Sequence, residues 1–426
     1  MSQTFDVIVI GGGPSGLMAA IAARLQGAST LVLEKGNKLG RKLGISGGGR
    51  CNVTNAKPMD ELMKNIPGNG RFLYSALSQF SNREIIEFFE SLGIRLKEED
   101  RGRVFPITDK ASTVVRALIE KVNALGIVVR QDTPVEGLLV ECGHVMGVKL
   151  RDGDTVLAHS VIIATGGCSV PQTGSTGDAY PWASAVGHTI ITPYPTEVPL
   201  TSPASFITSR ALQGLSFKDA TISIQNDRGK TLTQEYGDFM FTHFGLTGPI
   251  ALRCSHYVST ALRKDPDAVL SAVIDFFPEQ PAAQFVATLK DHRSHDGAKQ
   301  INTRLSEWLP DRLVAVMLER AGIAPTTTMA HLGNEAITEI TACIKKFRMP
   351  IRGTLPLEKA TVTGGGVSIK EIVPHTMASK LCTGLYFAGE VLDVHAHTGG
   401  YNITVAFSTG HAAGIAAAEY AEALHS

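Results

Sequence analysis

The stretch Phe5–Gly16, with the sequence FDVIVIGGGPSG, decides the fold of this 426-residue chain. Its apolar first half predicts a buried strand, and its glycines predict a tight turn into a helix over about residues 14–26. A second apolar run, Leu31–Leu33, follows and ends at Glu34. Strand, glycine turn, helix, strand and acid in this order predict a pocket for a dinucleotide.

Each residue type in this stretch has a physical reason. Gly11 lets the chain turn sharply out of the strand, Gly13 lets a pyrophosphate approach the backbone, and Gly16 lets the helix pack on the sheet. The helix that begins at Pro14 directs its free N–H groups at the phosphates. Glu34 stands where a carboxylate accepts hydrogen bonds from ribose hydroxyls. A glycine-rich turn in an unrelated α/β protein is the alternative, and the agreement of these features argues against it.

The composition is that of a globular protein with more than one domain. Hydrophobic residues make up 43% of the chain and charged residues 19%, and 426 residues exceed one ordinary core. Forty basic residues balance forty acidic ones, so no basic footprint for nucleic acid or an anionic membrane is visible. We expect no signal peptide and no membrane-spanning segment.

The cysteines predict a reduced setting without disulfides or zinc. They are scattered without a CxxC pair, which argues against a disulfide framework, a zinc site and a redox dithiol. We therefore expect a cytoplasmic protein with no metal site. The six are Cys51, Cys142, Cys168, Cys254, Cys343 and Cys382.

The pattern along the chain predicts an α/β protein in which a Rossmann-like domain is interrupted. Prolines between 193 and 203 suggest a crossover rather than an element interior, and strand-like alternation follows at 220–225 and 231–235. Residues 265–324 have a mostly helical pattern. We expect a dinucleotide-binding domain at 1–191 and 356–426, a β-rich middle or substrate domain at 192–265 and 326–355, and a small helical insert at 266–325.

Helical and alternating apolar patterns predict further elements in the first domain. Ser81–Asn82 is the expected cap of one helix. The expected helices are 72–79, 83–92, 112–125 and about 401–423, and the expected strands are 127–130, 135–140, 144–150, 155–158, 160–164 and 385–388.

A glycine-rich loop at 40–52, GRKLGISGGGRCN, is the second stretch that carries chemistry. Such a loop brings backbone N–H groups against a flat polar ligand. Arg41, Lys42 and Arg50 would stand near phosphates, or near a flavin that becomes anionic on reduction. The apolar residues of the loop argue against a mobile surface segment.

The C-terminal stretch completes the predicted pocket. Phe387–Asp393 follows a strand, and Gly399–Ile403 opens the last helix. A helix N-terminus aimed at the N1 and C2=O edge of a flavin would stabilise negative charge there and favour hydride acceptance. Neither 165–177 nor 364–369 forms a second dinucleotide fingerprint, so NAD(P)H is expected only as a transient reductant over the flavin.

Together these motifs resemble the YhiN/BaiN-like bacterial FAD flavoprotein family, to which aminoacetone oxidase is similar. The resemblance is carried by 11–16, 45–55, 241–249 and 384–393. It implies FAD, a Rossmann-like FAD-binding domain split between the chain ends, a β-rich middle domain and a helical insert. No residue pattern demands covalent attachment, so we expect the FAD to be non-covalent. It also implies NAD(P)/FAD-dependent redox chemistry. It does not identify the substrate, because similar members include an amine oxidase and a reductase of steroid-like enones.

Two positions depart from the family pattern. Gly44 replaces a bulky apolar residue, and His395 stands where the family has Asp. A histidine changes the charge and the proton transfer available at that position. The substrate of a known member therefore does not transfer directly to this chain.

The expected cofactor-binding residues come from all these stretches. Cys51 has no partner cysteine nearby, so we expect a buried small hydrophobe rather than a redox thiol. The full set is Gly11, Gly13, Pro14, Ser15, Gly16, Glu34, Lys35, Arg41, Lys42, Ser46, Gly47, Gly48, Cys51, Asn52, Val135, Thr165, Gly166, Gly389, Glu390, Gly400, Asn402 and Ile403.

Four side chains are candidates for catalysis. His243, at an expected strand-to-helix junction, is either an acid or base at the flavin or a capping or core histidine. His397, like the neighbouring His395, either contacts substrate or is a surface-loop histidine. Tyr401 either contacts the ligand or only packs. Arg50 holds an anionic substrate, a cofactor phosphate or a structural carboxylate.

The expected function is that of an FAD-dependent oxidoreductase. It would move a hydride between flavin N5 and a small amine-like or enone-like substrate. A redox-sensing or scaffolding flavoprotein without turnover is the alternative. An RNA-modifying flavoprotein is disfavoured by the balanced charge, so we expect a small-molecule partner, no nucleic acid and no membrane. The sequence leaves the oligomeric state open.

Overall fold

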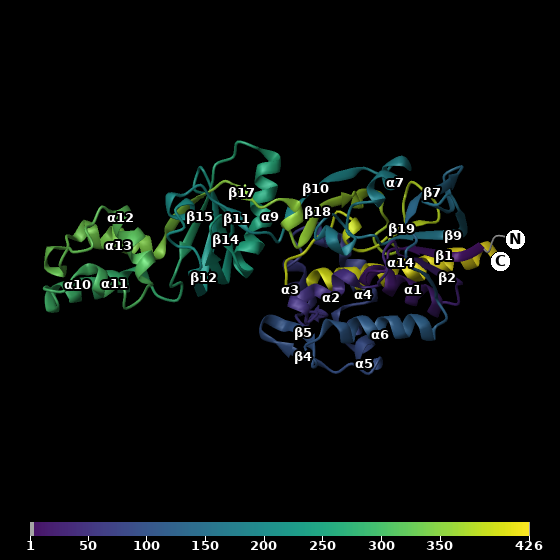
Figure 1. Cartoon of the computed structure of the whole chain (residues 1–426), viewed down its shortest axis with the longest axis horizontal. Helices are drawn as coiled ribbons and strands as arrows, with labels where there is room; N and C mark the ends of the chain where they lie inside the picture. The colour runs from purple at the N-terminus through teal and green to yellow at the C-terminus, as the bar shows by residue number, and fades with distance from the viewer. Residues whose placement is uncertain (1–3, 426) are drawn as a thin grey trace. The chain divides into compact units, whose positions relative to one another are not determined.

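Figure 1 shows the computed structural model, which describes residues 4–425. The chain divides into two compact units. The first runs to Tyr194 and resumes at Leu357, and the second spans Pro195–Pro356. The first unit is therefore built from both ends of the chain.

A seven-stranded sheet forms the centre of the first unit. Its strands follow the order β6-β2-β1-β9-β8-β7, and β19 pairs with the later part of β9. The pairs among β6, β2, β1, β9 and β19 are parallel, whereas β7, β8 and β9 form an antiparallel meander. These strands are β1 (Thr4–Ile10), β2 (Thr30–Leu33), β6 (Val128–Arg130), β7 (Val135–Glu141), β8 (His144–Leu150), β9 (Thr155–Ile163) and β19 (Leu385–Phe387).

Strand β9 is longer than the sequence predicts. The patterns at 155–158 and 160–164 predict two strands, but the structure has one continuous strand. The prediction was wrong because β1 pairs with β9 from Leu157 to Ile163, so His159 and Ser160 do not interrupt it. The Ser160 hydroxyl is buried and donates to the Ala417 carbonyl at 3.1 Å.

Helices α1 (Pro14–Leu25) and α14 (Tyr401–His425) pack closely together beside the sheet (Figure 1). A Cβ added at Gly410 would lie 2.3 Å from the Ser15 carbonyl oxygen, and one at Gly414 would lie 2.2 Å from that of Ala19. These two glycines of the last helix therefore allow its close contact with α1.

Shorter elements surround this sheet. Ser81 caps α5 in a capping box with Glu84, which confirms the predicted helix start. The helices are α2 (Arg41–Ile45), α3 (Met59–Lys64), α4 (Tyr74–Gln79), α5 (Asn82–Ser91), α6 (Ala111–Ala124) and α7 (Ala179–Ala185). The strands are β3 (Thr54–Asn55), β4 (Leu96–Glu99), β5 (Arg103–Pro106), β10 (Ile190–Thr196) and β18 (Val362–Val367).

Two of the predicted crossover prolines lie inside a strand. Pro193 and Pro195 belong to β10, which pairs only with β18 in a two-stranded sheet. A strand with one free edge tolerates proline, because the missing N–H faces away from the ladder.

The second unit contains a seven-stranded sheet of order β16-β15-β12-β13-β14-β11-β17. Its strands are β11 (Leu200–Thr201), β12 (Ser216–Asn226), β13 (Thr231–Phe241), β14 (Gly245–Thr247), β15 (Leu270–Asp275), β16 (Phe347–Ile351) and β17 (Gly353–Thr354). Its helices are α8 (Ser205–Thr208), α9 (Pro249–Lys264), α10 (Ala282–His295), α11 (Ile301–Leu305), α12 (Asp311–Ala321) and α13 (Asn334–Lys345). Helices and strands share one apolar core.

Two local predictions in this unit were wrong. Residues 270–275 lie in the predicted helical segment, but they form β15, where Leu270, Ala272 and Ile274 are buried at a period of two. His243 lies in the turn between β13 and β14 rather than at a strand-to-helix junction. The Thr242 hydroxyl closes this turn by accepting from the Gly245 N–H at 3.1 Å.

No helix within residues 4–425 combines the length and the apolar character needed to cross a bilayer. The longest helix in this range, α14, is packed within the first unit, where 15 of its 25 residues are buried.

Candidate cofactor-binding site

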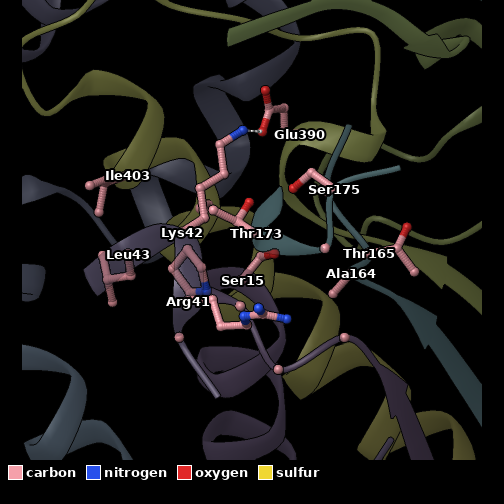
Figure 2. Close-up of a pocket in the computed structure, with 18 of the residues that line it drawn as sticks. Ser15, Arg41, Lys42, Leu43, Ala164, Thr165, Thr173, Ser175, Glu390 and Ile403 are labelled. Atoms are coloured by element: carbon pink, nitrogen blue, oxygen red, sulfur yellow. Dashed lines mark hydrogen bonds and ion pairs between the residues drawn. The ribbon is translucent and has the colours of Figure 1, made fainter. Parts of the chain in front are cut away.

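A cavity of about 450 Å³ lies in the first unit, and both ends of the chain line it (Figure 2). The turn between β1 and α1, the end of β2 and the loop at 40–52 form one part of its wall. The end of β9, the segment after β19 and the first turn of α14 form a second part, and residues 173–182 form a third. A volume of this size is typical of ligand and cofactor sites.

The glycine turn gives the cavity its open backbone. Gly11 has φ of 108°, and a Cβ there would lie 2.5 Å from the Ala164 carbonyl oxygen. A Cβ at Gly16 would lie 1.9 Å from the Gly11 carbonyl oxygen, so Gly16 serves packing and does not line the cavity. A Cβ at Gly13 would meet nothing within 4 Å, which leaves room for a pyrophosphate against the backbone.

Glu34 is held by backbone donors on the cavity wall. One carboxylate oxygen accepts from the Gly12 N–H at 2.8 Å, and the other accepts from the Gly36 N–H at 2.8 Å. Each oxygen retains a lone pair for a further donor. This geometry suits a carboxylate that binds ribose hydroxyls.

Lys42 and Glu390 form an ion pair on the wall, at 2.6 Å (Figure 2). Ser169 joins them, since its hydroxyl lies 2.8 Å from the Lys42 ammonium and 3.0 Å from the second Glu390 oxygen. The Thr363 N–H donates to that same oxygen at 2.7 Å. Burial alone would raise the pKa of Glu390, but the charge and hydrogen bond of Lys42, together with the hydrogen bonds from Thr363 and Ser169, hold this pKa below its usual value.

Sequence reasoning missed the wall formed by residues 173–182. Lys35, which it did predict, lies 2.5 Å from the Asp178 carboxylate and 2.5 Å from the Thr176 hydroxyl. Burial alone would raise the pKa of Asp178, but the hydrogen bonds from Lys35 and Thr176 and the charges of Lys35 and Arg151 together lower it. No sequence motif points to this wall, which combines a loop with the start of α7. Its cavity-lining members are Thr173, Gly174, Ser175, Asp178 and Trp182.

Thr165 offers a polar atom to a ligand. Its hydroxyl is buried, and no hydrogen-bond partner for it exists among the residues that the structure describes. Figure 2 shows this side chain beside Ala164 at the end of β9. Because buried polar groups are nearly always paired, the lack of a partner for this hydroxyl favours a bound polar ligand.

The start of α14 forms the C-terminal part of the wall. Gly400 has φ of 96°, and a Cβ there would lie 2.4 Å from the Thr54 carbonyl oxygen. The Asn402 amide is tied to the preceding loop, since it bonds the N–H and the carbonyl of Ala396 at 2.9 Å and 2.8 Å. The helix therefore presents its positive N-terminal end in a fixed position at the cavity.

The predicted cofactor-binding residues mostly line the cavity, with three exceptions. Gly16, Cys51 and Gly389 lie outside the lining. The Cys51 thiol is fully buried, and burial raises its pKa to about 12, as suits the expected small hydrophobe. A Cβ at Gly389 would lie 2.6 Å from the Ser15 hydroxyl, so Gly389 serves the close approach of the two chain ends.

None of the four candidate catalytic residues lines the cavity. Arg50 is paired with Glu99 and Asp109 at 2.5 Å each, which favours the structural-carboxylate interpretation. His397 and Tyr401 are buried, so the surface-loop interpretation of His397 was wrong. His243 is an exposed residue of the second unit, and its role stays a prediction, as do those of His397 and Tyr401.

His395 is buried, so the surface-loop interpretation of this residue was wrong. Its ring is edge-to-face with Tyr194, with centroids 5.8 Å apart. A Cβ at Gly68 would lie 2.2 Å from its Nδ1 atom, and the Gly68 N–H donates to its carbonyl at 3.1 Å. A glycine at 68 therefore makes room for the imidazole inside the fold.

The first unit combines parallel strands, this glycine turn, a carboxylate held in position to bind a ribose and a wall from the last helix. This combination defines a Rossmann-type dinucleotide-binding flavoprotein. The chain belongs to the HI0933-like family, whose Rossmann domain matches residues 5–416. This confirms the resemblance to the YhiN/BaiN-like family. By this membership the chain is an FAD-binding flavoprotein of the oxidoreductase class.

Three curated relatives match almost the whole chain. The 3-dehydro-bile acid delta(4,6)-reductase of Clostridium scindens is 31% identical and covers 96% of this chain and 98% of its own length. The ribosomal RNA dihydrouridine synthase of Haemophilus influenzae is 31% identical, with coverages of 97% and 98%. The Escherichia coli protein of the same name is 30% identical, with coverages of 96% and 96%.

Solved structures share the fold at low identity. The 3-ketosteroid delta1-dehydrogenase of Sterolibacterium denitrificans has a TM-score of 0.53 at 14% identity, with coverages of 98% of this chain and 99% of that chain. Mycobacterium smegmatis Sdh1 has a TM-score of 0.52 at 19% identity, with coverages of 100% and 70%.

Proposed function

We propose that this protein is an FAD-dependent reductase of carbon–carbon double bonds conjugated to a carbonyl. A nicotinamide reduces the flavin, the flavin transfers a hydride to one alkene carbon, and a proton from solvent adds to the other. The observation that carries the cofactor part is the cavity wall, where open backbone at Gly13, the held carboxylate of Glu34 and the buried hydroxyl of Thr165 suit FAD. The substrate part goes further and rests on the relatives.

The relatives share one kind of chemistry despite their different substrates. A delta(4,6)-reductase of a 3-dehydro-bile acid saturates an alkene conjugated to the 3-oxo group, as its name states. Dihydrouridine is uridine whose C5=C6 bond has been reduced, and that bond is conjugated to the C4 carbonyl. Reduction of an ene-carbonyl therefore joins both activities, whereas amine oxidation does not.

The chain's own residues would hold and orient the cofactor. The N-terminus of α1 and the Gly13 backbone would bind the pyrophosphate, and Glu34 would accept from the adenosine ribose. Lys42 and Glu390 would place a paired charge against the cofactor, and the N-terminus of α14 would favour negative charge on it. FAD, when bound, supplies the two-electron chemistry.

A single anaerobic experiment tests the reaction class. FAD-loaded protein is reduced with NADPH, NADH or dithionite, and a 3-oxo-Δ4 steroid is added while the visible flavin absorbance is followed. We expect the oxidised spectrum to return and mass spectrometry to find a product that has gained two hydrogens. Bleaching of the oxidised flavin by a small amine, with no response to an ene-carbonyl, would contradict the proposal. No response to any compound would favour a redox sensor.

Ribosomal RNA is the second substrate candidate, because two relatives of nearly full coverage are named ribosomal RNA dihydrouridine synthases. The balanced charge argues against strong non-specific phosphate binding, but it does not argue against recognition of a particular site. Unmodified ribosomal RNA is therefore the second arm of the same experiment. Dihydrouridine in that arm and no turnover of free enones would assign the RNA substrate.

A further inference from the structure

Three side chains of metal-ligand type come together in the first unit, away from the cavity. Asp6 lies on β1, His159 lies on β9, and His425 ends α14. One ligand atom from each residue lies within 4.8 Å of the other two. None of the three lines the cavity, so the cofactor site does not account for them.

The register of the sheet explains how two of these residues meet. Phe5 pairs with Ala158, and Val7 pairs with Ser160, in the parallel ladder between β1 and β9. Asp6 and His159 therefore stand side by side, and their side chains point to the same face. The end of α14 then brings the third residue to this pair.

The Asp6 carboxylate is already oriented. One oxygen accepts from the Ser29 N–H at 2.7 Å and from the Ser29 hydroxyl at 2.8 Å, and the other lies 2.7 Å from His425 Nε2. The rings of His159 and His425 are edge-to-face with centroids 4.9 Å apart.

Two imidazole nitrogens and one carboxylate oxygen are a ligand set that Zn²⁺ accepts, with water in the fourth position. Bonds of about 2.0–2.2 Å in a tetrahedron separate ligand atoms by roughly 3.3 Å. The observed separations come within reach of this value through small rotations, because His425 is exposed at a helix end. Ser29 would act as an outer partner that fixes the carboxylate.

We propose that Asp6, His159 and His425 bind one zinc-type divalent cation, which links the first strand to the end of the last helix. The sequence predicted no metal site because its argument rested on cysteine spacing, and these ligands lie far apart in the chain. The cation would anchor α14 at the end opposite to the turn that lines the cavity. It would thereby stabilise the joining of the two chain ends.

Zinc titration tests this proposal in untagged, metal-stripped, FAD-loaded protein. We expect calorimetry to find one zinc ion per chain in the wild type and Co²⁺ to give the absorption bands of a tetrahedral site. Loss of a residue that only supports a metal ligand weakens metal binding by about 10–100-fold. Loss of a ligand itself should cost at least as much, so His159→Gln and His425→Gln should each lower the zinc affinity at least about tenfold. His375→Gln, at an exposed histidine elsewhere in the first unit, is the matched control and should bind zinc like the wild type.

Thermal unfolding gives a second readout. Zinc should raise the Tm of the wild type and of His375→Gln but leave the two ligand variants unchanged. Circular dichroism and FAD content check that each variant folds. Two results would show that Asp6 and His425 form only an ion pair. One is the absence of saturable zinc binding in the wild type, and the other is zinc binding in both ligand variants that is as tight as in the wild type.

Discussion

The ion pair of Lys42 and Glu390 is the residue-scale feature that ties the two chain ends together at the cavity. Lys42 lies on α2, and Glu390 follows β19. Their side chains are 26% and 20% exposed, so solvent screens the pair only in part. A charge left alone at this position would be costly.

We expect Glu390→Gln to lower the free energy of unfolding of the apoprotein at neutral pH by about 1–3 kcal/mol, because Lys42 loses its partner. The folded pKa of Glu390 lies below its unfolded value, so its contribution is present above the unfolded pKa, near about 4.3, and is lost as the pH falls through the folded pKa. Denaturant unfolding at a series of pH values measures the gap from wild type.

The gap should therefore shrink below about pH 4. A gap that stays constant into strongly acidic solution would contradict the assignment. The double variant Lys42→Met/Glu390→Gln should lose less unfolding free energy than the sum of the losses in the two single variants. The reason is that each single variant leaves one charge unpaired, whereas the double variant leaves none.

Thr165 provides a second residue-scale prediction. Its buried hydroxyl has no partner among the described residues, so Thr165→Val should leave the stability of the apoprotein nearly unchanged. Loss of a hydrogen bond to the ligand should weaken FAD by about 1 kcal/mol, or roughly fivefold. Thr165→Ser retains the hydroxyl and should bind FAD like the wild type. Equal FAD affinity in all three proteins would show that the hydroxyl faces no cofactor.

The contact between α1 and α14 is the decisive feature at the scale of elements. It sets the N-terminal ends of both helices at one cavity. The contact is close because Gly410 and Gly414 remove side chains where α14 meets the backbone of α1. A change that disturbs the packing of α1 against α14 should therefore also disturb the cofactor site.

Gly410→Ala should destabilise the protein by about 1–3 kcal/mol and weaken FAD, because its Cβ would press on the Ser15 carbonyl in the cavity wall. Gly137→Ala is the control, since Gly137 has no strained φ and nothing within 4 Å of an added Cβ. Thermal unfolding and FAD titration compare the two. If Gly410→Ala proves as stable as Gly137→Ala, the close contact is not required.

Local sequence patterns predicted the elements whose signals are local. The strand, glycine turn and helix at 5–25 and the capped helix after Ser81 agree with the structure. Residues 270–275 were predicted as helix, because their strand character depends on pairing with β12 and β16. Such pairing involves partners distant in sequence, which a local period cannot reveal.

In the candidate site, too, the sequence predicted the residues that belong to motifs and missed residues that do not. Gly13, Glu34 and Glu390 carry motif signals, and they line the cavity. Asp178 and Trp182 line it too, but they lie just before and on α7, in a segment without a motif. Arg50 carries a motif signal, yet its charge is taken by Glu99 and Asp109, because a motif identifies a loop rather than the direction of each side chain.

At the scale of the whole molecule, both ends of the chain build one FAD site. Residues up to Tyr194 and from Leu357 share a single core, and the cavity lies within that unit. Every proposal about the reaction depends on FAD lying against the glycine turn. Gly13 allows this to be tested separately from folding, because its φ of −82° suits any residue and an added Cβ would meet only open space.

The most direct measurement is a titration of wild-type and Gly13→Ala apoprotein with FAD, followed by quenching of flavin fluorescence. The wild type should bind one FAD per chain. Gly13→Ala should keep its free energy of unfolding within about 1 kcal/mol, the usual cost at a helix cap, and lose at least about tenfold in FAD affinity. A wild type that does not bind FAD, or a Gly13→Ala variant that binds it equally well, would contradict the account.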